Sequence, residues 1–168
     1  MNASGHIDIV QFDNWHQHIP YTIQSYPHSG FNFVDPRDAD RYKTEYINVY
    51  LSREIPVHLQ DFFSSQFTWL ENIVYSVQKL EPGMILPWHT DTYAFFRKNK
   101  RISNINDIMR IIVFLEDWQS GHISEVGTAV NTKYKAGDWI SWVGETPHIA
   151  ANVGHTNRYT LQITGVAK

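Results

Sequence analysis

An alternation of polar and apolar residues near the end of the chain constrains the fold most. Over residues 158–164, every second side chain lies on the same face of an extended strand. One face begins with an arginine and suits a wet cavity that holds an anion, whereas the other suits packing against helices. We therefore expect a sheet with a polar cavity on one side. The polar set is Arg158, Thr160, Gln162 and Thr164, and the apolar set is Tyr159, Leu161 and Ile163.

Other segments rich in strand-forming residues accompany this one. Residues 74–80 predict a strand that ends in the turn Glu81-Pro82-Gly83, and residues 139–143 predict another after the turn signal at 135–138. Residues 147–153 then return as an antiparallel strand, and a turn at 152–154 leads into residues 158–164. Residues 6–12 and 45–51 predict two more strands, with a long irregular segment at 20–44 between them. The chain is therefore expected to be mainly β.

One helix is predicted after Pro56, a residue tolerated in the first turn of a helix. Apolar residues then recur at helical spacing, which indicates one buried stripe rather than a cofactor contact. We expect this helix to pack on the larger sheet of a jelly-roll sandwich. The stripe comprises Leu59, Phe62, Phe63, Phe67 and Leu70.

The candidate metal ligands are His89 and Asp91, in the motif His89-Thr90-Asp91, together with His148. Two histidines and one carboxylate on one face of a metal leave three positions open, which suits non-haem Fe(II) that activates O2. His89 and Asp91 follow a predicted strand, where side chains at i and i+2 share a face. The motif alone is a weak signal, because His6-Ile7-Asp8 repeats it inside the expected first strand. The alternative for Asp91 is a surface turn in which it caps a helix.

Arg158 is the candidate anion-binding residue. It follows His148 by 158 − 148 = 10 residues. Across one turn and two adjacent strands, this spacing allows the guanidinium to lie deeper in the same barrel mouth as the metal. An arginine offers a planar fork that pairs with both oxygens of a carboxylate. The alternative is an internal salt bridge.

The order of these features resembles the Fe(II)/2-oxoglutarate-dependent dioxygenases. A strand, a Pro-Gly turn and H-x-D are followed by a long insertion, then Ala-Gly-Asp, Pro-His and an arginine ten residues beyond the histidine. The resemblance covers roughly residues 72–165 and is nearest to the aspartyl/asparaginyl β-hydroxylase-like branch and similar small phage-encoded oxygenases. It implies a double-stranded β-helix, or jelly roll, in which His89, Asp91 and His148 hold Fe(II) and Arg158 binds 2-oxoglutarate.

In that branch, an arginine that opens the strand after H-x-D also contacts the cosubstrate. The matching residue is Arg110, within Met109-Arg110-Ile111-Ile112-Val113-Phe114-Leu115. A charged residue in an otherwise apolar strand is costly to bury without a partner, and a bound dianion would be such a partner. The alternative is a salt bridge from Arg110 to Glu116, Asp117 or another acid.

The resemblance also implies a reaction. 2-Oxoglutarate and O2 would be consumed, a substrate hydroxylated, and succinate and CO2 released. Some members of the branch carry glycine in place of the metal carboxylate, and related halogenases carry glycine or alanine there. Because Asp91 is present, hydroxylation is favoured over halogenation. The segment before residue 72 carries no motif of this family.

Composition indicates one catalytic domain over residues 1–168. With 168 residues and 42% hydrophobic content, one compact core is expected. No apolar run is long enough to span a membrane, and no secretory leader is visible. Cys 0 removes disulfides, thiolate zinc sites and cysteine catalysis, and is compatible with a reducing cytoplasm, where we expect the protein. A net charge of -3 gives no sequence-wide attraction to nucleic acid.

Three further groups of residues are candidates for binding, and each has a plainer interpretation. A basic loop before the Arg110 strand can attract an anionic substrate or remain solvated. Four tryptophans can line the pocket or belong to the core. The pair His16 and His18 lacks a third ligand nearby. The loop cations are Arg97, Lys98, Lys100 and Arg101, and the tryptophans are Trp88, Trp118, Trp139 and Trp142.

Two other functions stay open. One is a cupin-type metalloenzyme that uses no oxoacid, although the candidate motif at residues 89–91 is not the usual H-x-H with a downstream glutamate. The other is a non-catalytic jelly-roll binding module. The sequence does not identify the substrate, which can be a small molecule or a peptide, and it does not define the oligomeric state.

Overall fold

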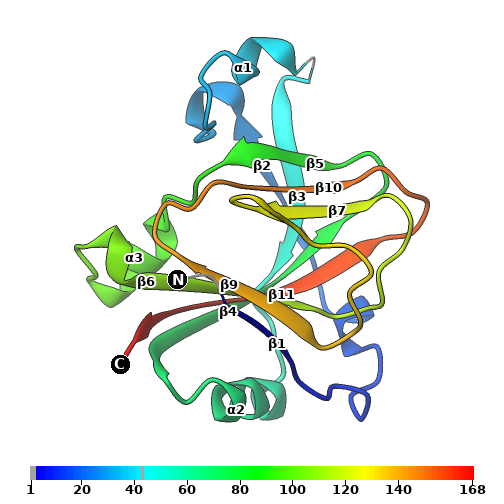
Figure 1. The fold of residues 1–168 in the computed structure, drawn as a ribbon, viewed down its shortest axis with the longest axis vertical. Helices are drawn as coiled ribbons and strands as arrows, with labels where there is room; N and C mark the ends of the chain where they lie inside the picture. Colours follow the sequence, from blue (N-terminus) through cyan, green and yellow to red (C-terminus); the bar gives the residue numbers. More distant parts are fainter. Residues whose placement is uncertain (1–2, 43) are drawn as a thin grey trace.

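Two antiparallel sheets lie face to face in the computed structural model, which describes residues 3–42 and 44–168 (Figure 1). The larger sheet has seven strands in the order β1-β9-β6-β11-β4-β3-β2, and the smaller has four in the order β5-β10-β7-β8. This is the mainly β, double-stranded β-helix architecture that the sequence predicts. No described helix is long and apolar enough to cross a membrane.

The strands are divided between the two sheets. The larger sheet consists of β1 (Ala3–His6), β2 (Thr22–Pro27), β3 (Tyr46–Ser52), β4 (Leu70–Leu80), β6 (Ile108–Phe114), β9 (Asp138–Val143) and β11 (Arg158–Ala167). The smaller sheet consists of β5 (Ile85–His89), β7 (His122–Val126), β8 (Ala129–Val130) and β10 (His148–Asn152). The helices are α1 (Asp38–Arg41), α2 (Val57–Gln66) and α3 (Ala94–Lys100), and three short 3-10 turns lie at Trp15–Gln17, His28–Gly30 and Ile105–Asp107.

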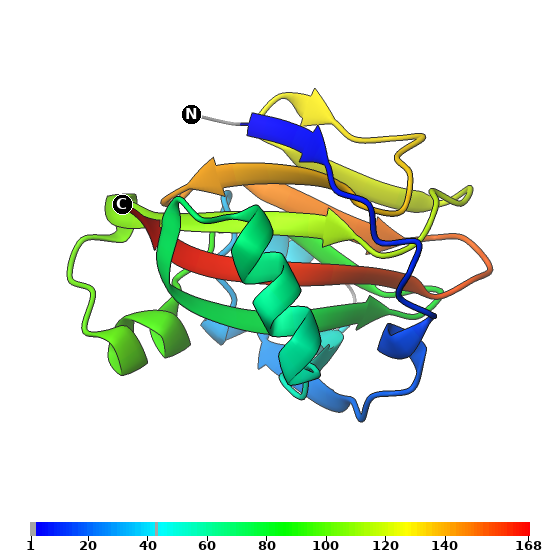
Figure 2. The ribbon, with the colours of Figure 1, turned by 90° about the horizontal axis from the view of Figure 1, so that it is seen from below.

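Helix α2 lies across the outer face of the larger sheet (Figure 2). Pro56 is its N-cap, as its fixed backbone angle allows. Leu59 and Phe63 are fully buried, and they share one core cluster with Leu161 of β11. Leu70, which was expected to extend the helical stripe, instead opens β4, although it is buried in the same cluster. The predicted packing of this helix on the larger sheet is therefore confirmed.

Strand β11 has the two faces that its alternation predicts. Its apolar set, Tyr159, Leu161 and Ile163, belongs to the core cluster beneath α2. Its polar set faces the space between the two sheets, where Arg158 and Thr160 are buried. The strand pairs with β4 on one side and β6 on the other, so it lies inside the sheet rather than at its edge.

The N-terminal half differs from the expectation in two places. The first strand is Ala3–His6 rather than 6–12, because the Asp8 side chain accepts a hydrogen bond from the Val10 backbone N–H at 3.0 Å, a local turn that replaces strand pairing. Within 20–44, residues Thr22–Pro27 form β2, an exposed edge strand paired with β3. Pro27 ends that strand, which is a position that an edge strand tolerates.

The turn between β10 and β11 also differs, because these strands are not neighbours. Strand β10 pairs with β5 and β7 in the smaller sheet, whereas β11 belongs to the larger one. The buried Asn152 amide holds this crossing by donating to the backbone carbonyls of Leu80 at 2.8 Å and Thr156 at 2.7 Å. His148 and Arg158 therefore approach the interior from opposite sheets.

Candidate metal centre

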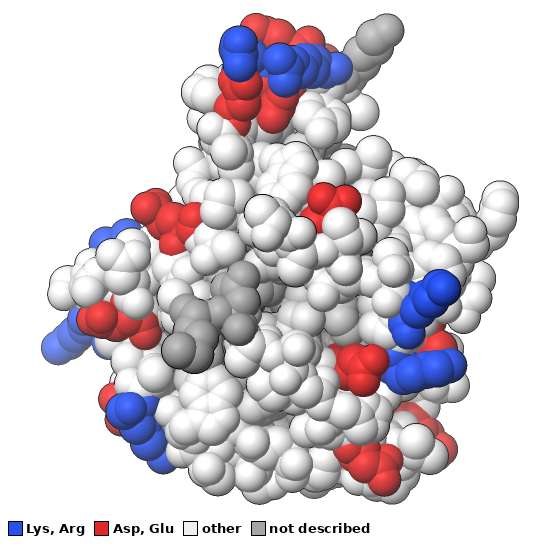
Figure 3. All heavy atoms as spheres, viewed as in Figure 1, with Lys and Arg blue, Asp and Glu red and all other residues white. Residues whose placement is uncertain are grey.

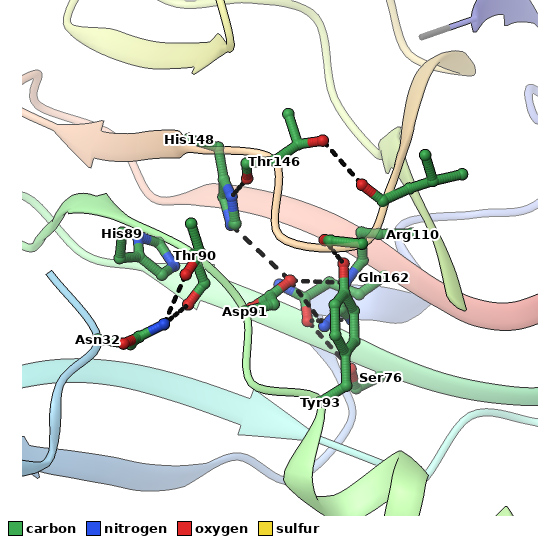
Figure 4. Close-up of polar contacts among 12 residues, drawn as sticks. Asn32, Ser76, His89, Thr90, Asp91, Tyr93, Arg110, Thr146, His148 and Gln162 are labelled. Atoms are coloured by element: carbon green, nitrogen blue, oxygen red, sulfur yellow. Dashed lines mark hydrogen bonds and ion pairs between the residues drawn. The ribbon is translucent and has the colours of Figure 1, made fainter. Parts of the chain in front are cut away.

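The two candidate histidine ligands face each other across one strand pair. His89 ends β5 and His148 begins β10, and the antiparallel register pairs these two residues directly. Their ring centroids are 4.2 Å apart. Asp91 lies two residues past the end of β5, and its Oδ2 is 3.8 Å from His148 Nε2 (Figure 4). The structure thus brings together the three ligands that the sequence predicts.

In each histidine, a contact between Nδ1 and a backbone carbonyl oxygen orients the imidazole ring. His89 Nδ1 lies 2.6 Å from the Pro87 carbonyl oxygen, and His148 Nδ1 lies 2.9 Å from the Thr146 carbonyl oxygen. A carbonyl can only accept, so each Nδ1 carries the proton and each Nε2 keeps a free lone pair. One ligand atom from each of the three residues lies within 4.8 Å of the others. Among the described residues, this is the one cluster of three or more such side chains that could hold a metal ion.

The protonation states also suit a metal. Burial and, to a smaller extent, the neighbouring His148 lower the pKa of His89 to about 4, although the charge of Asp91 opposes this shift. Burial likewise lowers the pKa of His148, although the charge of Asp91 opposes this shift. Burial alone would raise the pKa of Asp91, but the charges of Arg110, His148 and His89 together outweigh it, and the pKa falls to about 2. Near neutral pH, the cluster therefore offers two neutral imidazoles and one carboxylate, the forms that bind metal.

Aromatic side chains pack on both histidines. The Phe31 ring is 4.9 Å from the His89 ring, and the Trp142 ring is 4.7 Å from the His148 ring. The chain around Phe31 runs beside the end of β5, where the Asn32 carbonyl accepts from the Thr90 backbone N–H at 3.1 Å. The Asn32 side chain also donates to the Thr90 hydroxyl (Figure 4). A segment without a family motif therefore builds one wall of the metal centre.

Arg110 lies beside the candidate carboxylate ligand, with 13% of its side chain exposed. Its Nε and Nη2 lie 3.2 and 3.0 Å from Asp91 Oδ2, and its Nη1 donates to Gln162 Oε1 at 3.2 Å. Its guanidinium also lies 5.1 Å from the centre of the Tyr93 ring (Figure 4). The salt bridge that was left open for this residue is thus present, with Asp91 rather than Glu116 or Asp117.

Arg158 lies in a contrasting environment. It is only 3% exposed, and no Asp or Glu carboxylate of the described residues lies within 4.0 Å of it. Its Nε has no hydrogen-bond partner. Burial lowers the pKa of Arg158, although the neighbouring Tyr134 hydroxyl opposes this shift. The protein has therefore buried a cation that it does not neutralise with an acid of its own.

One cavity of about 540 Å³ between the sheets contains both the ligand cluster and Arg158. The polar face of β11 lines it as predicted. Arg158 pairs with Leu80, whereas Arg110 pairs with Thr164, which is 164 − 158 = 6 residues further along β11. At about 3.3 Å per residue, the backbone positions are roughly 20 Å apart. Arg110 is therefore at the metal end of the cavity and Arg158 at the opposite end.

Other predicted candidates lie outside the cavity. Arg97, Lys98 and Lys100 belong to helix α3 rather than to a loop, Arg101 follows it, and none of the four lines the cavity. Of the four tryptophans, Trp142 alone does so. His6 pairs with Asp138 and His16 pairs with Glu116. Each of these histidines therefore has an acidic partner and does not belong to the candidate metal centre.

The sequence analysis missed the contribution of β2 and β3 to this cavity. Tyr26 of β2 and Arg53, directly after β3, both line it. The available signal was the spacing of Val49, Leu51 and Arg53, which lie two residues apart and share one face of an extended segment.

On the face shown in Figure 3, charged side chains of both signs lie mainly around the margin.

Comparison with known proteins identifies the fold. No family model matches the chain, and no curated protein sequence is similar to it. Among solved structures, an oxidoreductase of the 2OG-Fe(II) oxygenase family from Burkholderia pseudomallei is 13% identical with a TM-score of 0.56, covering 94% of this chain and 78% of that one. A Pseudomonas putida prolyl-4-hydroxylase is 17% identical with a TM-score of 0.54, covering 79% and 80%. At these identities, the similarity establishes a shared double-stranded β-helix.

Proposed function

We propose that this protein is an Fe(II)- and 2-oxoglutarate-dependent oxygenase that hydroxylates an organic substrate and releases succinate and CO2. The observation that carries the proposal is the buried, unneutralised Arg158 in the same cavity as the His89, Asp91 and His148 cluster. Three candidate metal ligands alone fit many kinds of enzyme. Three such ligands that share a cavity with a buried arginine lacking an acidic partner fit far fewer.

The unpaired arginine calls for an anionic ligand. An isolated charge removed from water costs several kcal/mol unless a counter-charge or hydrogen bonds offset that cost. A guanidinium pairs best with a carboxylate, because its two parallel N–H groups match the two oxygens. A dicarboxylate lying along the cavity can reach Arg158 with one end while its other end approaches the metal centre. This is the role that we assign to 2-oxoglutarate.

The donor set supports iron. Two neutral imidazoles and one carboxylate on one side of an ion leave positions for an oxoacid and O2, which is the donor pattern of non-haem Fe(II) oxygenases. When bound, such an iron supplies the O2 activation, and the protein supplies binding and orientation. Asp91 provides the anionic ligand, which favours hydroxylation over halogenation. The aromatic rings of Phe31 and Trp142 limit the access of water to the histidines.

Arg110 is proposed to serve the metal end of the cosubstrate. Two of its nitrogens hold Asp91, and this contact fixes the carboxylate where it can ligate the ion. A guanidinium has five N–H groups, so the contacts to Asp91 and Gln162 leave donors for the near carboxylate of 2-oxoglutarate. The residue would thus contact the cosubstrate from β6 while it orients a metal ligand.

The test is titration of 2-oxoglutarate into the anaerobic Fe(II) protein, followed by the visible charge-transfer band of the chelate. The wild type should develop the band, and Lys98→Gln, which removes a surface charge outside the cavity, should match it. A wild type that binds Fe(II) and develops no band would reject the oxoacid. That result would favour a cupin-type metalloenzyme, and absence of metal binding would favour a non-catalytic binding module.

A further inference from the structure

The cavity contains one more cation than the proposed function uses. Three arginines and a single carboxylate line it. Arg110 is paired with Asp91, and Arg158 is assigned to the cosubstrate. Arg53 remains, and no Asp or Glu carboxylate of the described residues lies within 4.0 Å of its guanidinium.

Strand register places Arg53 near the metal end. Ser52 pairs with Val77, so Arg53 lies level with Ser76, the residue that pairs with Gln162 on the next strand. Gln162 is also the residue that accepts from Arg110. With neighbouring strands about 4.8 Å apart, Arg53 and Gln162 are separated by roughly 10 Å across the sheet. Arg53 is therefore nearer to the Arg110 end of the cavity than to the Arg158 end.

An aromatic side chain at the rim of the cavity contacts Arg53. Its guanidinium carbon lies 4.2 Å from the centre of the Phe95 ring, and Phe95, from helix α3, is 49% exposed at the rim. A guanidinium stacked flat on a ring keeps its N–H edge free for an oxyanion.

We propose that Arg53, stacked on Phe95, forms an anion site at the mouth of the cavity, and that the substrate is an organic anion held there by a carboxylate or phosphate group. The term substrate rests on the proposed function, whereas the anion site does not. This site does not include the basic residues at 97–101, for which substrate binding and solvation were both left open. Arg97 donates to the Ser103 carbonyl at 3.2 Å, and none of the four basic residues at 97–101 lines the cavity.

The experiment compares two anions with a neutral analogue. The Zn(II)-loaded full chain, with saturating 2-oxoglutarate, is titrated with 3-phenylpropionate, phenyl phosphate and 3-phenylpropionamide, and the affinities are measured by ligand-observed NMR. At least one anion should bind about fivefold to tenfold more tightly than the amide, because a charge-assisted contact at a partly exposed site is worth about that factor. The advantage should decrease as salt is added. The tighter of the two anions identifies the preferred group.

Matched variants assign the effect to Arg53. Arg53→Gln should abolish the advantage of the anions, Arg53→Lys should retain part of it, and Lys98→Gln should leave it unchanged. Because Arg53 is exposed, these changes should not disturb folding. The proposal is overturned if neither anion binds more tightly than the amide in the wild type, or if the advantage survives in Arg53→Gln.

A second variant distinguishes a failure of this proposal from a failure of the proposed function. In Arg158→Gln without 2-oxoglutarate, the Arg53-dependent preference for anions should persist. If the preference for anions disappears in Arg158→Gln but survives in Arg53→Gln, the anions bind at Arg158. That result overturns the anion site and leaves the oxygenase proposal intact. If 2-oxoglutarate fails to bind the wild type while the Arg53 effect persists, the oxygenase proposal is the one that fails.

Discussion

Arg110 and Arg158 lie on adjacent strands of one sheet and line one cavity, yet their surroundings differ. Arg110 contacts a carboxylate through two nitrogens and an amide oxygen through a third, whereas Arg158 is more deeply buried and has no acidic partner among the described residues. A buried charge that the protein neutralises belongs to the internal structure of the site. A buried charge that it leaves unneutralised is a candidate binding position for an anionic ligand.

The largest expected effect tests the metal end of this comparison. His148→Ala removes one of three protein ligands and should abolish tight Fe(II) binding while the chain stays folded. His155→Ala, which alters an exposed histidine outside the cavity, should keep the metal. Metal content after dialysis against a weak chelator is the measurement. Stoichiometric iron in His148→Ala would remove this residue from the ligand set.

The next effect compares the two arginines through the stability of the metal-free protein. Asp91→Ala leaves Arg110 without its carboxylate and should lower the free energy of unfolding by about 3 to 5 kcal/mol. Arg158→Met removes a charge that has no acidic partner and should cost nothing or stabilise the chain. Urea denaturation of both variants gives the two values. Equal losses in the two variants would contradict the distinction between a paired and an unpaired arginine.

For the affinity of the cosubstrate, a change at Arg158 should have a larger effect than a change at Arg110. Arg158→Lys keeps the charge but loses the planar fork, so 2-oxoglutarate affinity should fall by roughly 2 to 5 kcal/mol, or about 30-fold to several-thousand-fold. Fe(II) binding should be unchanged. Arg110→Lys should have a milder effect, because its main contacts are to Asp91 and Gln162. Wild-type affinity in the Arg158 variant, measured by anaerobic titration, would exclude this residue from the cosubstrate site.

The smallest effect is a pH dependence at the metal end. In the metal-free protein the pKa of His89 is about 4, whereas an unfolded histidine titrates near 6.5. Between these values the unfolded chain binds the extra proton, so stability is complete above about pH 6.5 and falls by up to about 3 kcal/mol as the pH drops toward 4. His89→Gln should flatten this part of the curve. A slope that is identical in wild type and variant, from urea midpoints at each pH, would contradict the burial of a neutral His89.

Local patterns explain which parts of the fold the sequence could predict. The alternation over residues 158–164 correctly assigns both faces of β11, because a period of two residues is a property of the strand itself. The spacing in His89-Thr90-Asp91 likewise accounts for two candidate ligands that lie close together. The apolar stripe after Pro56 correctly predicts α2 and its packing. Each of these features is encoded within one short segment.

Features that depend on distant pairing could not be predicted. The turn at 152–154 reads as a hairpin, but the chain crosses there between two sheets, and no local signal distinguishes the two cases. The contact between Arg110 of β6 and Asp91, which follows β5, joins residues that are distant in the sequence, so the sequence left several acids as possible partners. Arg53 was overlooked because the segment around it carries no motif, although it lines the same cavity.

The direct pairing of His89 with His148 has a consequence for how the chain folds. The two residues are 148 − 89 = 59 positions apart, and each belongs to a strand that is short by itself. Closing so long a segment costs chain entropy, and non-local strand pairing is slow. No peptide that spans only β5 or only β10 contains all three ligands. An ion at this centre can therefore stabilise the finished fold by mass action, but it cannot act as a template for the early steps.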